Sequence, residues 1–229
     1  MTELRDKKKK IKDKMLDIII DCLSTGRSFP SENELTEILG ISRPTLRELL
    51  IEFKASGIIV SAQGKGREVQ LPNVSSSITD GWNILLKARP NTLLELLEVR
   101  LVLEKGFLPV VIQSLKLEDL QVMRDLVNRM EAKAIEEKVF KEEDHLFHRI
   151  LYSRTDNILL DQLLAAFWDL FDDMSEFHRS SNLVEAAALH KRLYEAIVTQ
   201  DLEKAEEFLD LHFKDIRSRL LGFMALEDK

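Results

Sequence analysis

Cysteine, proline and glycine are all scarce in this chain. Cys22 is the single cysteine among 229 residues, so no disulfide can form within one molecule, and we expect a reducing compartment, the cytoplasm. Five prolines and eight glycines favour a helix-rich protein, because both residue types interrupt helices. No apolar run approaches the roughly 18 residues of a membrane span, and no apolar core follows the charged residues 1–10. We therefore expect neither a membrane span nor a signal peptide.

Positive residues are outnumbered by negative ones, 33 Lys and Arg against 40 Asp and Glu. The net charge of −7 by itself argues against a protein that binds nucleic acid. The distribution is uneven, however, since residues 1–71 hold 13 Lys and Arg against 11 Asp and Glu (+2), whereas the remainder holds 20 against 29 (−9). A DNA-binding module would therefore lie in the N-terminal third, ahead of an acidic domain. Hydrophobic residues make up 45% of the chain, which is enough for packed cores.

Two short helices joined by a tight turn are predicted in the N-terminal third, after a helical pattern over residues 10–23. Ser31 and Glu34 are spaced as a capping box, in which each side chain satisfies a free backbone N–H at the start of a helix. Gly40 is placed to end this helix in a left-handed turn. Ser42 is then a good N-cap for the next helix.

The second of these helices has a buried side and a basic side. Its apolar residues recur at the spacing i, i+3, i+4 and i+7, which makes one buried stripe of Leu46, Leu49, Leu50 and Phe53. Arg43, Arg47 and Lys54 fall beside that stripe and are left to face outward. A short helix, a tight turn and a second helix with exposed basic residues at its start are typical of a DNA-binding helix-turn-helix.

After Gly57 the pattern changes to that of two strands. Residues 58–60 are a short β-prone run, and residues 68–71 alternate polar and apolar side chains. A glycine-rich basic turn separates them and consists of Gln63, Gly64, Lys65, Gly66 and Arg67. We expect a β-hairpin, the wing of a winged helix, whose tip reaches phosphates or the minor groove.

Residues 29–71 resemble the winged helix of the GntR family of bacterial repressors and activators. The matching stretches are Phe29-Pro30-Ser31-Glu32, Leu39-Gly40-Ile41-Ser42-Arg43, Leu46-Arg47-Glu48 and Gly64-Lys65-Gly66. The resemblance implies a regulator that binds double-stranded operator DNA, where arginine can make paired hydrogen bonds to guanine. The residues that it implies in DNA binding are Ser42, Arg43, Thr45 and Arg47 of the helix and Gln63, Gly64 and Lys65 of the wing. Asn33 stands where many relatives have arginine, which affects the expected operator sequence.

The domain organisation follows from these patterns. We expect a winged helix-turn-helix domain over 1–72, with three helices and a hairpin, a linker over 73–77, and an all-α helical bundle over 78–229. The fold class is therefore mostly α. The predicted helices of the bundle span 78–88, 91–106, 107–114, 117–136, 138–153, 157–179, 183–199 and 202–222.

Three histidines and one aspartate are predicted to face the interior of this bundle. Asp144 and His148 are four residues apart on the buried side of one helix, so their side chains can converge. His190 and His212 lie within the apolar stripes of the last two helices. A carboxylate and three imidazoles suit a divalent metal such as zinc, nickel or manganese.

The remaining two histidines test this interpretation. His145 points away from the apolar stripe of its helix and is expected to be solvated. His178 aligns with the apolar residues of its own helix, so spacing alone leaves it open as a ligand or a pocket residue.

Residues 78–222 resemble the helical C-terminal domain of FadR-type GntR regulators, the FCD domain. The matching residues are Glu98, Val99, Arg100 and Glu104; Asp144, Phe147 and His148; Asn157; His190, Leu193, Ala196 and Ile197; and Asp201, Ala205 and His212. In this family the aspartate and the three motif histidines bind a metal, and small carboxylates bind beside it. The resemblance therefore implies the ligands Asp144, His148, His190 and His212, and His178 matches no ligand position. Leu189 stands where relatives often have glutamate.

Arg100 is the candidate for binding an organic acid, because a planar guanidinium suits a carboxylate. The alternative is a structural ion pair with Glu104, four residues on. We expect a homodimer whose bound metal and effector control the spacing of two winged helices on operator DNA. The rival hypotheses are a metal-sensing repressor without an organic effector, a metal-dependent hydrolase, and a fatty acyl-CoA responder. The intact metal motif disfavours the last of these, and no further carboxylate is marked as a general base for the hydrolase.

Overall fold

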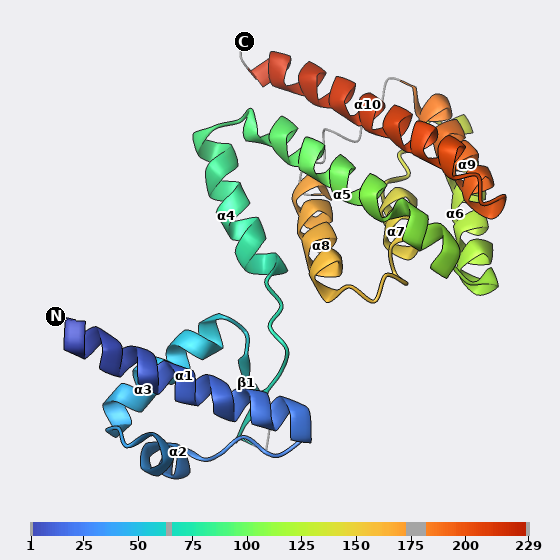
Figure 1. The fold of residues 1–229 in the computed structure, drawn as a ribbon. Coiled ribbons are helices and arrows are strands. Elements are labelled where there is room, and N and C mark those ends of the chain that lie inside the picture. The colour runs from blue at the N-terminus through green and yellow to red at the C-terminus, as the bar shows by residue number, and fades with distance from the viewer. Residues whose placement is uncertain (1, 63–65, 173–181, 228–229) are drawn as a thin grey trace. The chain divides into compact units, whose positions relative to one another are not determined.

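The computed structural model describes the chain except for residues 1, 63–65, 173–181 and 228–229. The chain folds into two compact units, Met1–Ser77 and Ile78–Lys229 (Figure 1). The described residues form ten helices and one two-stranded sheet, which lies in the N-terminal unit. The predicted fold class, a winged helix-turn-helix followed by an all-α bundle, is confirmed.

The N-terminal unit consists of α1 (Thr2–Thr25), α2 (Glu32–Leu39), α3 (Arg43–Ala55), β1 (Ile59–Ala62) and β2 (Gly66–Val69). The caps that the sequence predicts are present. Ser31 accepts a hydrogen bond from the backbone N–H of Glu34, and the Glu34 side chain accepts one from the Ser31 backbone. Gly40 adopts φ 65°, the left-handed conformation that ends α2 and turns the chain into α3.

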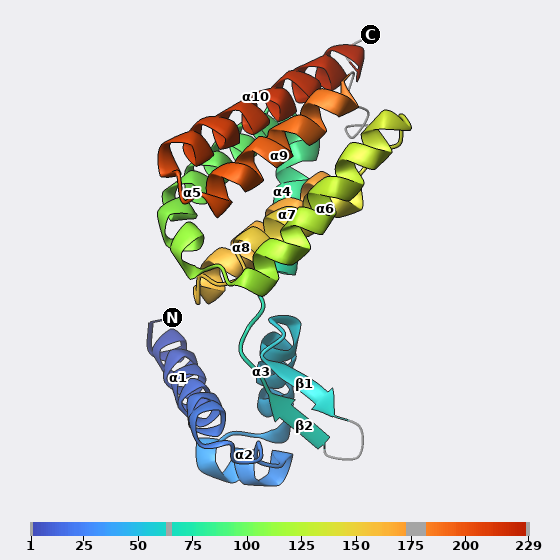
Figure 2. The ribbon, with the colours of Figure 1, turned by 90° about the vertical axis from the view of Figure 1, so that its right-hand side faces the viewer.

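One apolar cluster holds the N-terminal unit together. It joins α1 through Met15 and Ile19, α2 through Leu35, and α3 through Leu46 and Phe53. The strands pair antiparallel, with Ile59 opposite Val69 and Ala62 opposite Gly66, and form the wing beside α3 (Figure 2). Helix α1 is longer than the predicted 10–23, because its lysine-rich first turns are good helix formers even without an apolar stripe.

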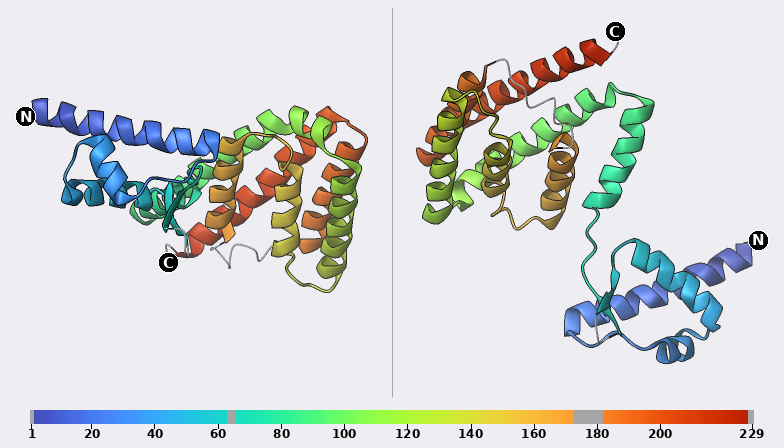
Figure 3. Two further views of the ribbon diagram at one scale, coloured as in Figure 1. Left: turned by 90° about the horizontal axis from the view of Figure 1, so that it is seen from below. Right: turned by 180° about the vertical axis from the view of Figure 1, so that it is seen from behind.

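The C-terminal unit is a bundle of seven described helices. They are α4 (Ser75–Ala88), α5 (Thr92–Ser114), α6 (Leu117–Ile135), α7 (Lys141–Leu151), α8 (Ile158–Asp172), α9 (Leu183–Val198) and α10 (Leu202–Glu227). Helix α10 packs along both α9 and α5, and α6 packs against α7 and α9 (Figures 2 and 3). No helix among the described residues has the length and apolar character needed to cross a membrane.

Several predicted helix boundaries were wrong, among them the start of α7, at Lys141 instead of 138, and the end of α10, at Glu227 instead of 222. A break between residues 106 and 107 was expected, but α5 is one helix from Thr92 to Ser114 with Pro109 inside it. Burial of Leu108, Val111 and Ile112 in the bundle core stabilises this stretch and outweighs the weak helix propensity of glycine and proline. Helix α4 begins at Ser75, three residues before the predicted start, where Asn73 Oδ1 accepts a hydrogen bond from the Ser75 backbone N–H at 3.0 Å.

Candidate metal centre, adjoining cavity and DNA-reading surface

Four potential metal ligands meet inside the bundle. Asp144 and His148 come from α7, His190 from α9 and His212 from α10, and the ligand atoms that they offer all lie within 4.8 Å of one another. His190 Nε2 is 2.6 Å from Asp144 Oδ1, and His148 Nε2 is 3.1 Å from His212 Nε2. The three imidazoles are almost wholly buried, whereas the Asp144 side chain is 30% exposed. The structure therefore brings together all four residues that the sequence selected.

Partners behind two of the rings set which nitrogen faces the cluster. His190 Nδ1 lies 2.9 Å from the carbonyl oxygen of Ala186, one helical turn earlier. His148 Nδ1 lies 3.3 Å from Glu104 Oε2 on α5. For His190, an N–H at Nδ1 that donates to the Ala186 carbonyl leaves the Nε2 lone pair for a metal ion, which is how proteins orient histidine ligands.

The electrostatics of the cluster favour the protonation states that metals bind. Burial raises the pKa of Asp144, but the neighbouring histidines, His190 foremost, outweigh it, and the pKa lies well below its ordinary value. Burial, together with His190 and His148, holds the pKa of His212 well below its ordinary value. An ionised carboxylate and a neutral imidazole are the forms required of ligands. The donor set therefore fits a borderline divalent ion such as zinc.

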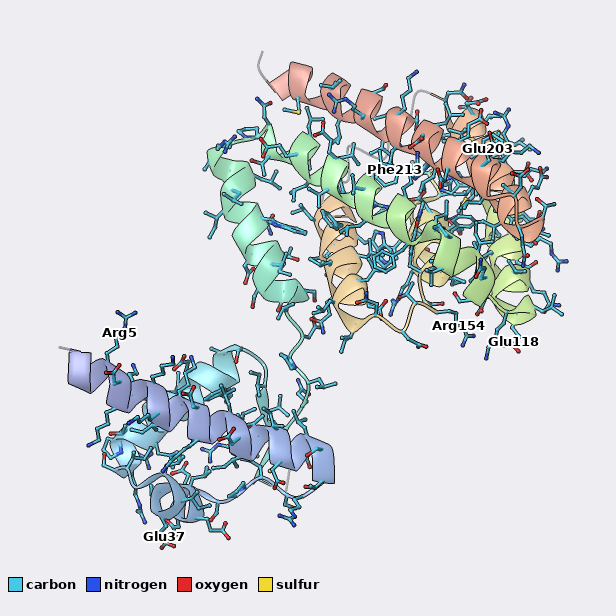
Figure 4. All side chains as sticks on the ribbon, in the orientation of Figure 1. Arg5, Glu37, Glu118, Arg154, Glu203 and Phe213 are labelled. Atoms are coloured by element: carbon cyan, nitrogen blue, oxygen red, sulfur yellow. The ribbon has the colours of Figure 1, made fainter. Side chains whose placement is uncertain are left out.

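Arg100 lies next to this cluster and is 5% exposed. Its Nε is 2.6 Å from Glu104 Oε1, so the predicted ion pair within α5 is present. The guanidinium carbon also lies 5.7 Å from the ring centroid of Phe171 and 5.3 Å from that of Phe213. Phe213 comes from α10, where Figure 4 labels it. Glu104 is wholly buried and contacts both Arg100 and His148, so one carboxylate links the metal cluster to this arginine.

A cavity opens beside the cluster and has a volume of about 690 Å³, including the solvent at its mouth. Asp144, His148 and His190 line it on one side, together with Arg100. The remaining lining combines basic with apolar and aromatic side chains, and includes Lys141, Arg219, Phe140, Trp168, Leu183 and Ile216. Arg100 is thus paired with Glu104 and also lines a cavity, and its role in binding an organic acid stays a prediction.

The first turn of α3 presents the basic residues that were predicted to read DNA. Ser42 caps the helix and accepts a hydrogen bond from the Thr45 backbone N–H, and Ser42, Arg43, Thr45 and Arg47 are all exposed. Arg43 Nη2 donates to Asn33 Oδ1 at 3.0 Å. Asn33, which stands where many relatives have arginine, therefore positions Arg43.

Glu32 connects the wing to this helix. Its Oε1 accepts a hydrogen bond from Arg67 Nη2 of β2 at 2.7 Å, and its Oε2 lies 3.9 Å from Arg47 Nε. The hydrogen bond from Arg67 lowers the pKa of Glu32, so this carboxylate stays ionised near neutral pH. Gln63, Gly64 and Lys65, the predicted wing contacts, lie outside the described residues.

Two family models match the chain over these same two units. The model described as bacterial regulatory proteins of the gntR family matches residues 7–69, and the FCD domain model matches residues 95–215. The chain belongs to the GntR family of transcription regulators and carries an FCD domain.

Individual GntR relatives agree with this assignment. The Uxu operon transcriptional regulator of Escherichia coli K12 is 27% identical over 214 residues, which cover 89% of this chain and 82% of the relative. The Glc operon transcriptional activator of the same strain is 28% identical over 215 residues, covering 89% and 84%. A solved GntR protein of Streptococcus agalactiae has the same fold, with a TM-score of 0.70 at 22% identity over 91% of this chain and 98% of that one. The relatives are transcription regulators, not enzymes, so the hydrolase hypothesis is set aside.

The sequence misjudged one histidine of this GntR regulator and missed several cavity residues, Trp168 and Arg219 among them. His145 was expected to face solvent, but it is half-buried, lines the cavity and lies with its ring 5.5 Å from that of Trp168. Trp168 and Arg219 were not singled out, because helical spacing marks an inward position without showing which cavity it reaches. His178 lies outside the described residues.

Proposed function

We propose that this GntR-family regulator binds a divalent metal ion, zinc before nickel or manganese, through Asp144, His148, His190 and His212. The observation that carries the proposal is the convergence of one carboxylate and three imidazoles, whose ligand atoms lie within 4.8 Å of one another. A metal with four protein ligands can expand its coordination or keep a position for a ligand atom from outside. The metal would supply a Lewis-acidic centre that binds an anionic oxygen.

We further propose that a small organic acid is the effector and binds in the adjoining cavity. Arg100 supports this role, because its guanidinium lies over the rings of Phe171 and Phe213 and it lines the cavity beside the metal ligands. A guanidinium carries five N–H donors, which is more than Glu104 can accept. Arg100 is thus suited to bind a carboxylate while it remains paired.

DNA binding by a dimer completes the proposed function. Val99, Val102 and Val110 lie on one side of α5 and are 52%, 71% and 52% exposed, which suits pairing with a second copy of the chain. Such a homodimer would place two winged helices on a two-fold symmetric operator in the bacterial cytoplasm. Effector and metal would act by binding more tightly to one of two dimer states that differ in operator affinity. Relatives include both an activator and the repressor NanR, so whether this regulator activates or represses transcription is to be measured.

Replacing Arg47 by alanine is expected to weaken operator binding by about 1–3 kcal/mol, because one arginine contact to a base edge is lost. The measurement is a fluorescence-anisotropy titration at fixed salt, with the operator identified by selection from random DNA. Arg149→Ala, an exposed arginine of the helical unit, is the control for a general loss of positive charge. Equal affinity of wild type and Arg47→Ala would show that the recognition helix is assigned wrongly.

A thermal-shift screen of small carboxylates on zinc-loaded protein tests the effector proposal. An acid at 100 times its dissociation constant is expected to stabilise the protein by about 2.7 kcal/mol. The same acid is expected to change operator affinity in the anisotropy assay. If no acid stabilises the protein while zinc alone changes operator affinity, the metal-sensing hypothesis replaces the organic effector.

A further inference from the structure

The first turn of α2 contributes two side chains that hold arginines of the DNA-reading surface. Asn33 Oδ1 accepts a hydrogen bond from Arg43 Nη2 of α3 at 3.0 Å. Glu32 Oε1 accepts one from Arg67 Nη2 of β2 at 2.7 Å, and its Oε2 lies 3.9 Å from Arg47 Nε. Two consecutive residues of α2 therefore contact three arginines, which come from both the recognition helix and the wing (Figure 2).

The arginines are more accessible than the carboxylate that contacts two of them. The side chain of Glu32 is 29% exposed, against 38% for Arg67 and 70% for Arg47, and all three line one groove between α3 and the wing. Arg43 is exposed as well. A guanidinium has five N–H donors, so Arg43 can give one of them to Asn33 and present others to a base pair. The two acceptors of α2 are therefore suited to orient arginines that meet DNA.

An arginine whose position is fixed recognises DNA differently from a mobile one. A mobile arginine can bind a phosphate on any DNA, because phosphates occur at every step of the backbone. An arginine held in one conformation binds well only where a guanine presents its O6 and N7 acceptors at the matching position. It also loses less conformational entropy when it binds there. Acceptors within the protein that hold an arginine therefore raise the preference for operator over other DNA.

The two acceptors differ in charge, and this gives them separable effects. Asn33 is neutral, so it can orient Arg43 without changing the attraction of the surface to phosphates. Glu32 is an anion beside Arg47 and Arg67, so it offsets part of their positive charge and repels any phosphate that approaches the groove. Glu32 is therefore expected to lower the affinity for DNA of every sequence in addition to orienting its two arginines.

We propose that Glu32 and Asn33 are positioning residues that give this regulator its discrimination between operator and other DNA. Asn33 acts through Arg43, at the base pair that Arg43 reads. Glu32 acts through Arg67 and Arg47, and its charge also suppresses binding to unrelated sequences. This inference rests on the proposed function, because it assumes that α3 is the recognition helix.

The test of Asn33 is a double-mutant cycle with Arg43. Affinities of the full chain for the selected operator and for an unrelated duplex are measured by fluorescence anisotropy. Asn33→Leu removes the acceptor at similar volume, and it is expected to lower operator affinity about 5–10-fold, the lower end of the effect of a base contact. Affinity for the unrelated duplex is expected to stay within about twofold. In an Arg43→Ala background Asn33→Leu is expected to have no further effect, because Asn33 acts through that arginine.

The test of Glu32 is the salt dependence of binding. Glutamine has one acceptor oxygen in place of two, so Glu32→Gln cannot hold both arginines. It is expected to raise affinity for the unrelated duplex about 3–10-fold and to steepen its dependence on salt by up to about 0.9 in the log–log slope, the value for one phosphate contact. Operator affinity is expected to rise less, so the ratio of operator to unrelated affinity falls.

Glu37→Gln is the matched control for the loss of one negative charge. Glu37 is an exposed glutamate of the same helix, on another side of α2 from Glu32, and Figure 4 labels it. Glu37→Gln is expected to leave the ratio of operator to unrelated affinity unchanged. Circular dichroism checks that each variant is folded, and Asn33→Ala replaces Asn33→Leu if the latter does not fold.

The outcomes are distinguishable. A ratio that is unchanged in both Asn33→Leu and Glu32→Gln overturns the inference. An equal fall of the ratio in Glu37→Gln and Glu32→Gln overturns the role of Glu32, because net charge is then the cause. An undiminished effect of Asn33→Leu in the Arg43→Ala background overturns the role of Asn33. If Arg43→Ala and Arg47→Ala both leave operator affinity unchanged, the assignment of α3 in the proposed function fails as well.

Discussion

Glu104→Gln is expected to lower the unfolding free energy of the helical unit by about 3–5 kcal/mol, the effect of breaking a buried ion pair. Glu104 is wholly buried, with its two oxygens 2.6 Å from Arg100 Nε and 3.3 Å from His148 Nδ1. Glutamine keeps the volume of the side chain but removes its charge, which leaves the buried Arg100 guanidinium uncompensated. Urea unfolding of protein freed of metal by a chelator measures the effect without a contribution from metal affinity.

Two controls identify the cause of this loss. Glu98→Gln disrupts an exposed ion pair between Glu98 and Arg217, whose side chains are 67% and 46% exposed, respectively. It is therefore expected to change the unfolding free energy by about 1 kcal/mol or less. The double variant Arg100→Gln with Glu104→Gln is expected to be more stable than Glu104→Gln alone, because no unpaired charge remains. If Glu104→Gln is as stable as the wild type, another group compensates the charge of Arg100.

The effect of Glu104→Gln should also depend on pH. Burial raises the pKa of Glu104, but Arg100 and His148 outweigh it and hold the pKa below its ordinary value of 4.5. A carboxylate whose pKa is lower in the folded state stabilises the fold above its unfolded pKa and loses this contribution as the pH falls through the folded value. The stability difference between wild type and variant is therefore expected at neutral pH and should narrow below about pH 4.5.

Removal of the metal is expected to destabilise the helical unit by a similar amount. Zinc at 100 times its dissociation constant contributes about 2.7 kcal/mol. For a unit of this size that corresponds to a fall in melting temperature of roughly 5–10 °C on chelation. His190→Ala is expected to abolish this shift, because it removes a ligand that is 2% exposed and lies 2.6 Å from Asp144 Oδ1.

The matched control for the metal prediction is His145→Ala. His145 is on the same helix as two of the proposed ligands and lines the cavity, but it is not part of the four-residue cluster. It is therefore expected to keep the metal-dependent shift. Metal analysis of protein purified without chelator or a nickel column provides a second reading. Equally low metal content in wild type and His190→Ala would refute the metal site.

Short-range patterns allowed much of this protein to be predicted. The capping box of Ser31 and Glu34, the Gly40 turn and the stripe of Leu46 to Phe53 each depend on residues within one or two helical turns, and each is present in the fold. Asp144 and His148 could be paired for the same reason. The convergence of His190 and His212 on them was predicted from inward positions and a family resemblance, and the packing of α9 and α10 realises it.

Contacts between distant segments were decided by tertiary packing alone. Glu104 contacts His148, which is 44 positions away in the sequence, and Arg219 lines the same cavity as Arg100, which is 119 positions away. No helical periodicity encodes either of these two proximities. Packing also kept α5 continuous through Pro109, where local propensity predicted two helices. A helical wheel shows which side of a helix is buried, but neighbouring helices determine what that side meets. The sequence by itself therefore determined the recognition helix and the candidate metal ligands. The tertiary structure decided the carboxylate that links metal to arginine and the second arginine of the cavity.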